Sequence, residues 1–327
     1  MEPKSLQEAI IYFASPENCR TYLVARRWPD GVVCPRCQSK NVLFLEKYNR
    51  WHCREKHAAP QFTLKTQTIF EDSPIGLDKW LTAMWMLCNC KNGVASWEIH
   101  RTLKVTQKSA WFMLGRLRLA LQDNARGGKL GGPDSAPVEV DETFIGGKAR
   151  FMHKSKRERL SRDGGMQGGH GKAVVMGLLE RGGKVTATVI PHRKNNITEK
   201  IVRELVEPGT EVHTDEFGGY YNLSDGYLHK VVNHLEGYVK ENVHTNGIEN
   251  FWSCLKRGLT GTYIAVEPFH LFRYVDEQAF RYNNRATRDN PLNDSDRFDA
   301  AVRQIVGKRL TYKALTGKEA ERQAEPF

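Results

Sequence analysis

The sequence predicts an α/β protein whose larger part is a mixed β-sheet flanked by helices. Strand-like and helix-like runs alternate after residue 137. Before residue 124, a cysteine-rich segment is followed by almost continuous helical spacing. The 327 residues are enough for two or three folding units, and a 40% hydrophobic share can fill their cores.

We expect five parts along the chain. The linker is the clearest boundary, because its sequence NARGGKLGGPDSAP is dense in Gly, Pro and Ser and can bury little. The expected parts are an amino-terminal helix with a metal-binding segment (1–72), a helical region (76–123), the linker (124–137), the mixed-sheet domain (138–290) and a helical carboxy-terminal tail (291–327).

The charge balance indicates a polyanionic partner. The 49 Lys and Arg against 38 Asp and Glu give a net charge of +11, which makes nucleic acid the leading partner class. The longest apolar runs, Leu81 to Cys88 and Ala173 to Leu179, are far shorter than the roughly 20 residues of a membrane span. Seven cysteines are too few for a disulfide scaffold of this length, so we expect the reducing cytosol.

The amino-terminal elements follow from local spacing. Helical spacing covers Leu6 to Leu23, and short β-prone runs lie between Gly31 and Ile69. Leu77 to Leu121 should form three helices, with a short turn before the third that favours a helix-turn-helix. The last of these helices would then present basic and polar side chains to DNA: Gln107, Lys108, Arg116 and Arg118. The alternative is a plain helical core with solvated charges.

The elements after the linker alternate in type. We expect a strand at Val138 to Phe144, a hairpin of Ala173 to Leu179 with Lys184 to Ile190, a helix at Thr198 to Leu205, a strand at Glu211 to Thr214 and a helix at Asn246 to Arg257. This order implies a mixed sheet covered by helices.

Four residues have the spacing of a zinc site. Cys34 and Cys37, followed by Cys53 and His57, form the pattern C-x2-C-x15-C-x3-H, in which two short knuckles can hold one tetrahedral ion. The fourth ligand is open, because His52 or Cys19 could replace His57. The alternative is three buried free thiols, which does not account for the C-P-x-C turn.

Three acids stand at positions that suit a second kind of metal site. Asp141 lies in a predicted strand, Asp215 directly follows another, and Glu249 lies on a predicted helix. Carboxylates on adjacent strands and a facing helix can hold two Mg²⁺ ions. Lys256, seven residues after Glu249, would lie on the same helical face, where it could meet a DNA phosphate. Taken singly, each acid could equally be a solvated surface carboxylate.

The segments around these acids resemble the catalytic blocks of the IS1595 (ISXO2-like) insertion-sequence transposases. The run VEVDETFIGG from Val138 looks like their first block, His213-Thr-Asp215 with Gly219-Tyr220 like the second, and VHTNGIENFWSCLKR from Val243 like the third. The Cys-Pro-Arg-Cys turn and Thr68-Ile-Phe70 resemble the zinc ribbon of the same family, so the resemblance covers nearly the whole chain.

The resemblance implies an RNase H-like core with two Mg²⁺ (or Mn²⁺) ions per active site and one structural Zn²⁺. Asp141, Asp215 and Glu249 would be the Mg²⁺ ligands, and Lys256 with Arg257 would contact DNA. Some family members have Asn as the third residue, so Asn246, one turn before Glu249, remains an alternative or a neighbouring ligand. The second knuckle departs from the family, with C-x3-H in place of C-x2-C.

Several neighbouring residues have two interpretations each. His213 and His244 are expected to support the active-site backbone by hydrogen bonds rather than to act as general bases. Trp252 could stack on an end base or belong to the core. The basic loop from Lys148 to Arg162 is expected to contact DNA phosphates, and the alternative is a solvated loop. The candidate contact residues in this loop are Lys154, Lys156, Arg157 and Arg159.

The sequence therefore predicts a DDE-type transposase that binds terminal inverted repeats and target DNA, cleaves the ends and transfers the 3′ hydroxyl. It should act in the cytoplasm on the nucleoid. We expect at least a homodimer on DNA, because both element ends are joined in one reaction. Two alternatives stay open: a chemically silent, transposase-derived DNA-binding regulator, and a two-metal nuclease that cuts DNA without joining it.

Overall fold

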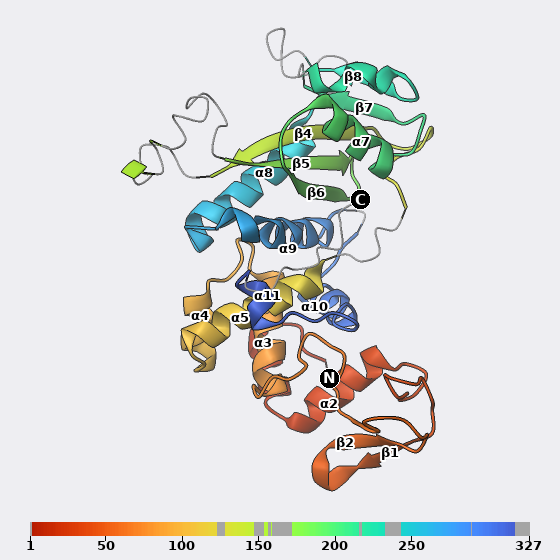
Figure 1. The fold of residues 1–327 in the computed structure, drawn as a ribbon, viewed down its shortest axis with the longest axis vertical. Helices are drawn as coiled ribbons and strands as arrows, with labels where there is room; N and C mark the ends of the chain where they lie inside the picture. The colour runs from red at the N-terminus through yellow and green to blue at the C-terminus, as the bar shows by residue number, and fades with distance from the viewer. Residues whose placement is uncertain are drawn as a thin grey trace. The chain divides into compact units, whose positions relative to one another are not determined.

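The structure is a computed structural model that describes residues 2–122, 128–146, 154–155, 158, 172–215, 218–232, 243–288 and 290–317 (Figure 1). The chain divides into two compact units. Unit 1 combines Met1–Asp123 with Asn284–Phe327, and unit 2 is Asn124–Asn283. Each unit has its own core and is described separately.

Unit 1 begins with two helices and a small sheet. Helices α1 (Leu6–Phe13) and α2 (Pro16–Arg27) replace the single helical stretch expected from the sequence. The break falls at Ser15, whose hydroxyl caps α2 by accepting a hydrogen bond from the Asn18 N–H, directly before a proline that starts the helix. The antiparallel strands β1 (Val42–Leu45), β2 (Arg50–Cys53) and β3 (Gln61–Phe62) follow, with the 3-10 turn η1 (Glu46–Tyr48) between the first two.

Three helices then form the centre of unit 1: α3 (Leu77–Asn89), α4 (Ser96–Leu103) and α5 (Gln107–Leu121). The turn between α4 and α5 is tight, because Lys104 adopts a left-handed conformation with φ 49° and Thr106 caps α5 by accepting from the Ser109 N–H. These bounds agree with the three helices expected between Leu77 and Leu121.

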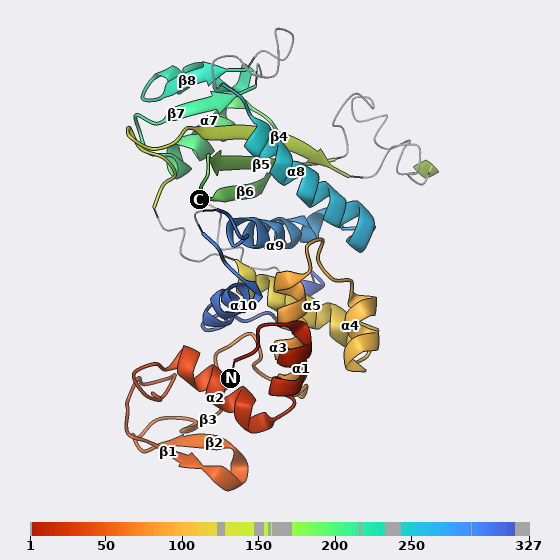
Figure 2. The same ribbon diagram turned by 180° about the vertical axis from the view of Figure 1, so that it is seen from behind.

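The carboxy-terminal residues complete the core of unit 1 instead of forming a separate tail. Helix α10 (Asp294–Arg303) packs on α2 and α3 (Figure 2), and the short α11 (Tyr312–Leu315) packs on α5 (Figure 1). Phe298 of α10 is fully buried, with its ring centroid 4.9 Å from that of Trp85 and 5.6 Å from that of Phe13. Residues 291–327, expected as a tail behind the mixed-sheet domain, therefore belong to the amino-terminal unit.

Unit 2 is built on a five-stranded mixed sheet, as the alternation of runs predicted. Its strands are β4 (Val138–Ile145), β5 (Ala173–Glu180), β6 (Val185–Ile190), β7 (Glu211–Thr214) and β8 (Leu228–Val231), in the spatial order β6-β5-β4-β7-β8. The hairpin β5–β6 and the pair β4–β5 are antiparallel, whereas β7 runs parallel to both β4 and β8. Strand β8 was not expected from the sequence, because it has only four residues and two of its apolar side chains are exposed.

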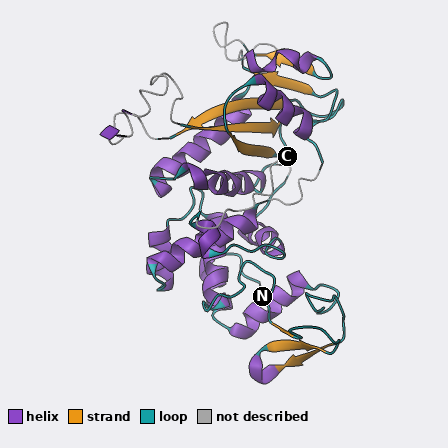
Figure 3. Cartoon of the chain, in the orientation of Figure 1, coloured by secondary structure: helices purple, strands orange, loops and turns teal. Residues whose placement is uncertain are grey.

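Helices cover both faces of this sheet (Figure 3). Helix α7 (Asn195–Leu205) packs on the face formed by Val140, Met176 and their neighbours, together with the 3-10 segment η3 (Gly218–Ser224). Helices α8 (Asn246–Gly258) and α9 (Leu271–Asn283) pack on the opposite face, around Val175 and Leu179. A π-helical turn, η4 (Leu259–Tyr263), and a 3-10 turn, η5 (Pro268–His270), connect these two helices.

The described end of the expected linker is packed against unit 2. Leu130 N donates to Leu205 O over 2.7 Å, and Glu207 N donates back to Leu130 O over 2.9 Å. Among the described residues, no helix combines the length and the apolar character needed to span a membrane, since the longest, α5, has 15 residues.

Candidate functional site

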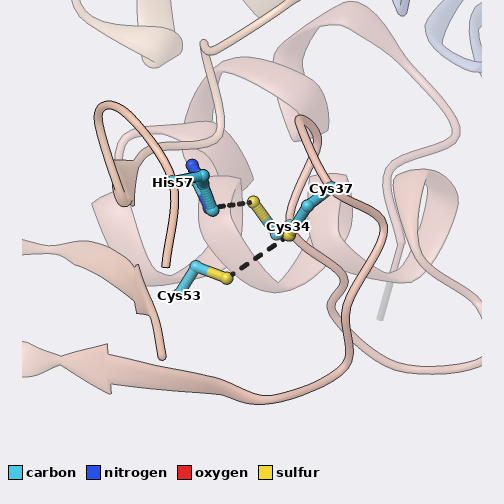
Figure 4. A group of neighbouring side chains, drawn as sticks. All are labelled: Cys34, Cys37, Cys53 and His57. Atoms are coloured by element: carbon cyan, nitrogen blue, oxygen red, sulfur yellow. Dashed lines mark hydrogen bonds between the residues drawn. The ribbon is translucent and has the colours of Figure 1, made fainter. Parts of the chain in front are cut away.

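The four zinc-ligand candidates come together in unit 1 (Figure 4). Cys34 and Cys37 lie in the turn before β1, Cys53 ends β2, and His57 follows in the next loop; their ligand atoms all lie within 4.8 Å of one another. Cys34 Sγ is 3.5 Å from His57 Nε2, and Cys37 Sγ is 3.5 Å from Cys53 Sγ. Because a tetrahedral zinc with Zn–S bonds of about 2.3 Å needs ligands close to this separation, the group fits one structural Zn²⁺.

The two alternative fourth ligands lie elsewhere. Cys19 is buried between α1 and α2, where its thiol donates to Phe13 O over 3.1 Å. His52 stands in β2 opposite Leu43. The geometry therefore favours His57, whose Nδ1 lies 2.8 Å from Ala58 O and leaves Nε2 directed toward Cys34.

The thiols of the zinc group differ in acidity. Burial acts to raise the pKa of Cys34, but hydrogen bonds from the backbone of Cys37 and Arg36 outweigh it and lower the pKa to about 7. Burial raises the pKa of Cys53 to about 11, and the neighbouring thiols Cys37 and Cys34 add to the rise. Zinc binding must therefore release a proton from Cys53 at neutral pH.

In unit 2, two of the candidate acids lie at the same level on adjacent parallel strands. Asp141 is in the middle of β4, and Asp215 directly follows β7. Glu139 and His213 are register partners in these strands, and each acid stands two residues further along. Burial raises the pKa of Asp141, and the nearby negative charge of Asp215 adds to the rise, which shows that the two carboxylates influence each other.

Trp252 of α8 holds Asp141 in place. Its Nε1 donates to Asp141 Oδ2 over 2.9 Å, while Asp141 Oδ1 accepts from the Glu142 N–H over 2.7 Å. The indole is almost completely buried and lies against Gly177, the partner of Asp141 in β5. Of the two interpretations of Trp252, the structure supports the core position and adds a hydrogen bond to the first acid.

Arg193 connects the second acid to a buried carboxylate that the sequence analysis did not single out. Its Nε donates to Glu142 Oε2 over 2.7 Å, and another guanidinium nitrogen donates to Asp215 Oδ2 over 2.9 Å. The other oxygen of Glu142 accepts from the Tyr220 hydroxyl, and the carboxylate is fully buried. Asp215 is thus oriented by a cation that is itself anchored inside the sheet.

The third candidate acid lies on α8, the helix that Trp252 joins to Asp141. Glu249 is exposed on the first turn of α8, where its Oε1 accepts from the Thr245 hydroxyl over 3.1 Å, and Asn246, the first residue of the helix, is also exposed. Within the described ranges, the cysteine–histidine group is the one set of three or more His, Cys, Asp or Glu residues grouped closely enough to hold a metal ion. The three acids are thus carried by β4, the end of β7 and the first turn of α8.

The donor set of the pair suits a hard divalent cation. Each oxygen of Asp141 accepts one protein hydrogen bond, and a carboxylate oxygen has two acceptor sites, so both oxygens keep capacity for a metal ion. Carboxylate oxygens are the ligands that Mg²⁺ prefers. The two histidines near the acids both contact the Arg181 side chain, whose guanidinium lies 3.1 Å from His213 Nδ1 and 3.2 Å from His244 Nδ1. Their expected support of the active-site backbone stays a prediction.

The candidate DNA contacts differ in availability. Lys108 is exposed at the start of α5, with its ammonium 4.7 Å from the Tyr312 ring centroid. Lys256 and Arg257 are exposed in the last turn of α8. In the basic loop, Lys154 is exposed and lies 4.0 Å from Glu158, whereas Lys156, Arg157 and Arg159 lie outside the described residues.

Arg116 is a correction to the sequence analysis. Its side chain is only 7% exposed, and its guanidinium donates to the carbonyl oxygens of Leu310, Ile69 and Glu71. These bonds tie α5 to two other segments of unit 1, so the guanidinium forms its hydrogen bonds inside the protein. Arg118, on the same helix, is also buried. Neither side chain is available to DNA.

Comparison with known proteins gives the family. Residues 129–283 match the ISXO2-like transposase domain, and residues 14–55 match the transposase zinc-ribbon domain. An uncharacterized protein in transposable element ISH50 of Halobacterium salinarum is 29% identical over 261 residues, which cover 76% of this chain and 84% of the relative. An uncharacterized transposase-like protein of Haemophilus influenzae is 32% identical over 102 residues, which cover 31% of this chain and 82% of the relative. The chain belongs to the IS1595 family of ISXO2-like insertion-sequence transposases, with the transposase domain in unit 2 and the zinc ribbon in unit 1.

Proposed function

We propose that this transposase is of the DDE type: it binds the inverted repeats at the element ends, cleaves DNA there and transfers the freed 3′ hydroxyl into target DNA by two-metal-ion catalysis. The observation that carries the proposal is the shared level of Asp141 and Asp215 on adjacent parallel strands, with α8 bonded to Asp141 through Trp252. The central position of β4, antiparallel to β5 and parallel to β7, supports an RNase H-like core.

Asp141 and Asp215 would hold two Mg²⁺ or Mn²⁺ ions, together with Glu249 or with Asn246 one turn earlier. When bound, such ions lower the pKa of an attacking water and neutralise charge on the leaving 3′ oxygen. The chain's own residues orient the carboxylates, since Trp252 donates to Asp141 and Arg193 donates to Asp215. Glu249 is exposed, so its carboxylate is accessible to a hydrated ion.

The DNA would be held by exposed cations on both units. Lys256 and Arg257 follow Glu249 along α8 and are exposed, which supports a role for them in binding phosphates. We propose the same role for Lys154, Lys156, Arg157 and Arg159 of the basic loop. In unit 1, α4 and α5 with their tight turn support a helix-turn-helix that presents Lys108 to the element end. Joining two ends in one reaction requires at least a homodimer on DNA.

The test is cleavage and joining of an oligonucleotide that carries the element end, in Mg²⁺, with binding followed separately by gel shift. Asp141→Ala and Asp215→Ala should each lower cleavage and joining by at least about 10³-fold, because a two-metal site fails when one carboxylate is lost, while end binding persists. Asp225→Ala, which removes an exposed carboxylate elsewhere in unit 2, is the matched control. Asp141→Ala protein that still joins ends would refute the site.

The same assay separates the remaining alternatives. Glu249→Ala and Asn246→Ala identify the third ligand, because only the variant that loses it should lose cleavage; equal residual activity in both would refute the assignment to this turn of α8. Wild-type protein that cuts without joining would be a nuclease. Wild-type protein that binds ends without cutting would be a regulator.

A further inference from the structure

A second polar cluster in unit 2 lies beside the acids and is centred on Arg181, in the turn between β5 and β6. Its Nε donates to Glu139 Oε1 over 3.0 Å. Another guanidinium nitrogen lies 3.1 Å from His213 Nδ1 and donates to His244 O over 3.0 Å. One side chain therefore contacts β4, β7 and the segment that leads into α8.

Two of these contacts fall at corresponding positions in the first and second catalytic blocks. Glu139 stands two residues before Asp141, and His213 stands two residues before Asp215. Residues separated by two along a strand share one face of the sheet, about 7 Å apart. The cluster is therefore on the same face as the two acids, one side-chain row away from them.

Glu139 extends the contact to the helix that carries Glu249. Its Oε2 accepts from the Ile248 N–H over 2.9 Å, in the first turn of α8, where backbone donors have no partner within the helix. The approach is so close that a Cβ on Gly247 would stand 2.8 Å from that oxygen. The Glu139 side chain is fully buried, so its charge needs the guanidinium of Arg181.

The hydrogen bond to His213 also orients the imidazole. A guanidinium can only donate, so His213 Nδ1 accepts from Arg181 and the ring proton is on Nε2. That proton is directed at Glu211 Oε1, 2.6 Å away. The side chain of His213 is almost completely buried. Arg181 therefore fixes a side chain of β7 that stands two residues before Asp215.

We propose that Arg181 is a positioning residue that sets the placement of Asp141, Asp215 and Glu249 relative to one another. It does so through Glu139 on β4, His213 on β7 and the segment that leads into α8. The proposal rests on the proposed function, because it assigns a structural cause to the geometry of that metal site.

The test uses two variants that keep the buried charges balanced. Arg181→Lys retains the pairing with Glu139, but a single ammonium cannot reproduce the planar fork that also contacts His213 and His244. The double variant Glu139→Leu with Arg181→Met removes both charges together, which is often neutral for stability. Arg203→Lys is the matched control, because the Arg203 guanidinium also makes more than one hydrogen bond in unit 2, here to the carbonyl oxygens of Asp225 and Asn222.

The readout is Tb³⁺ binding, followed by luminescence excited through tryptophan. Trp252 Nε1 is 2.9 Å from Asp141 Oδ2, so an ion on Asp141 is close to a tryptophan donor. Thermal unfolding reports the fold, and the Mg²⁺ concentration for half-maximal joining reports the reaction. Asp141→Asn identifies the part of the Tb³⁺ signal that depends on the first acid.

Both charge-balanced variants should unfold cooperatively, within about 5 °C of wild type, yet need about 10-fold more Tb³⁺ and Mg²⁺ for half-saturation; Arg203→Lys should match wild type. Folded variants with wild-type half-saturation would overturn the positioning role. Loss of cooperative unfolding in both variants would also overturn it, since Arg181 would then serve folding alone. A Tb³⁺ signal in wild type that survives Asp141→Asn would instead refute the proposed metal site.

Discussion

Gly177 controls how closely α8 approaches the sheet at Asp141, and Gly177→Ala tests that control. A Cβ built at Gly177 would stand 2.7 Å from Trp252 Cη2 and 2.8 Å from Ile248 Cδ1. Carbon atoms pack best at about 3.5–4.0 Å, so these atoms would have to withdraw by about 1 Å. The indole cannot withdraw alone, because it is buried beside Phe251 and its Nε1 is bonded to Asp141. The start of α8 must therefore move.

The expected cost has two parts. Overpacking of a filled core lowers the free energy of unfolding by about 1–3 kcal/mol. A shift of about 1 Å in α8 stretches the bond between Trp252 and Asp141 and displaces Glu249, and misplacement of this size can cost about 10²-fold in rate. Gly177→Ala should therefore join DNA ends about 10²-fold more slowly while the protein remains folded.

The assay combines urea unfolding with joining of a pre-cleaved end oligonucleotide. Gly261→Ala is the control, because nothing lies within 4 Å of a Cβ at Gly261; it should change neither measurement. If Gly177→Ala loses stability but joins at the wild-type rate, the distance between α8 and the sheet does not set the activity. A variant with unchanged stability would contradict the packing argument itself.

Two further predictions concern unit 1. Zinc affinity, measured by competition with a chromogenic chelator, should rise with pH, because thiols must release their protons to bind zinc. Cys53, with a pKa of about 11, contributes about one decade of affinity per pH unit. Below pH 7, Cys34 should add a second such contribution, because its pKa is about 7. In a His57→Cys variant, which has no imidazole that must also be neutral to bind zinc, an equal slope on both sides of pH 7 would contradict the low pKa of Cys34. Arg116→Met should lower the free energy of unfolding by about 3 kcal/mol, because it leaves buried carbonyl oxygens without a donor. Lys108→Ala should leave the free energy of unfolding within about 0.5 kcal/mol of wild type and flatten the slope of log affinity for end DNA against log salt by up to about 1 unit. Urea unfolding and salt titrations check both, and the reverse assignment of effects would contradict the burial argument.

The elements that position the acids were predictable because they depend on local pattern. Strands β4 and β7 and the β5–β6 hairpin follow from short runs of β-branched and apolar residues, and α8 follows from its helical spacing of apolar residues. The zinc ligands were predictable for a related reason, since a C-x2-C turn and a C-x3-H knuckle are short enough to be recognised in the sequence. These features are encoded within a few residues of one another.

The contacts that orient the acids could not be predicted, because they join residues far apart in the chain. Arg193 contacts Glu142 and Asp215 across separations of 51 and 22 residues, and nothing near it distinguishes it from the other 48 Lys and Arg. The burial of Arg116 could not be predicted for a similar reason. Helix α5 is buried on most of its circumference, so a charge within it does not mark a solvent face.

Unit 1 contains residues from both ends of the chain, and this affects when it can fold during synthesis. Ile69 N donates to Ile305 O, Arg116 donates to Leu310 O, and Leu315 lies against Gly115, so the helices around α5 reach their full packing only after residue 315 has left the ribosome. The domain that carries the acids, by contrast, is continuous and can fold during synthesis. A gene copy interrupted after unit 2 would then yield a product with an incomplete core around its basic helices, exposed to proteolysis. Decayed copies of the element would for this reason supply little stable fragment that contains the amino-terminal unit.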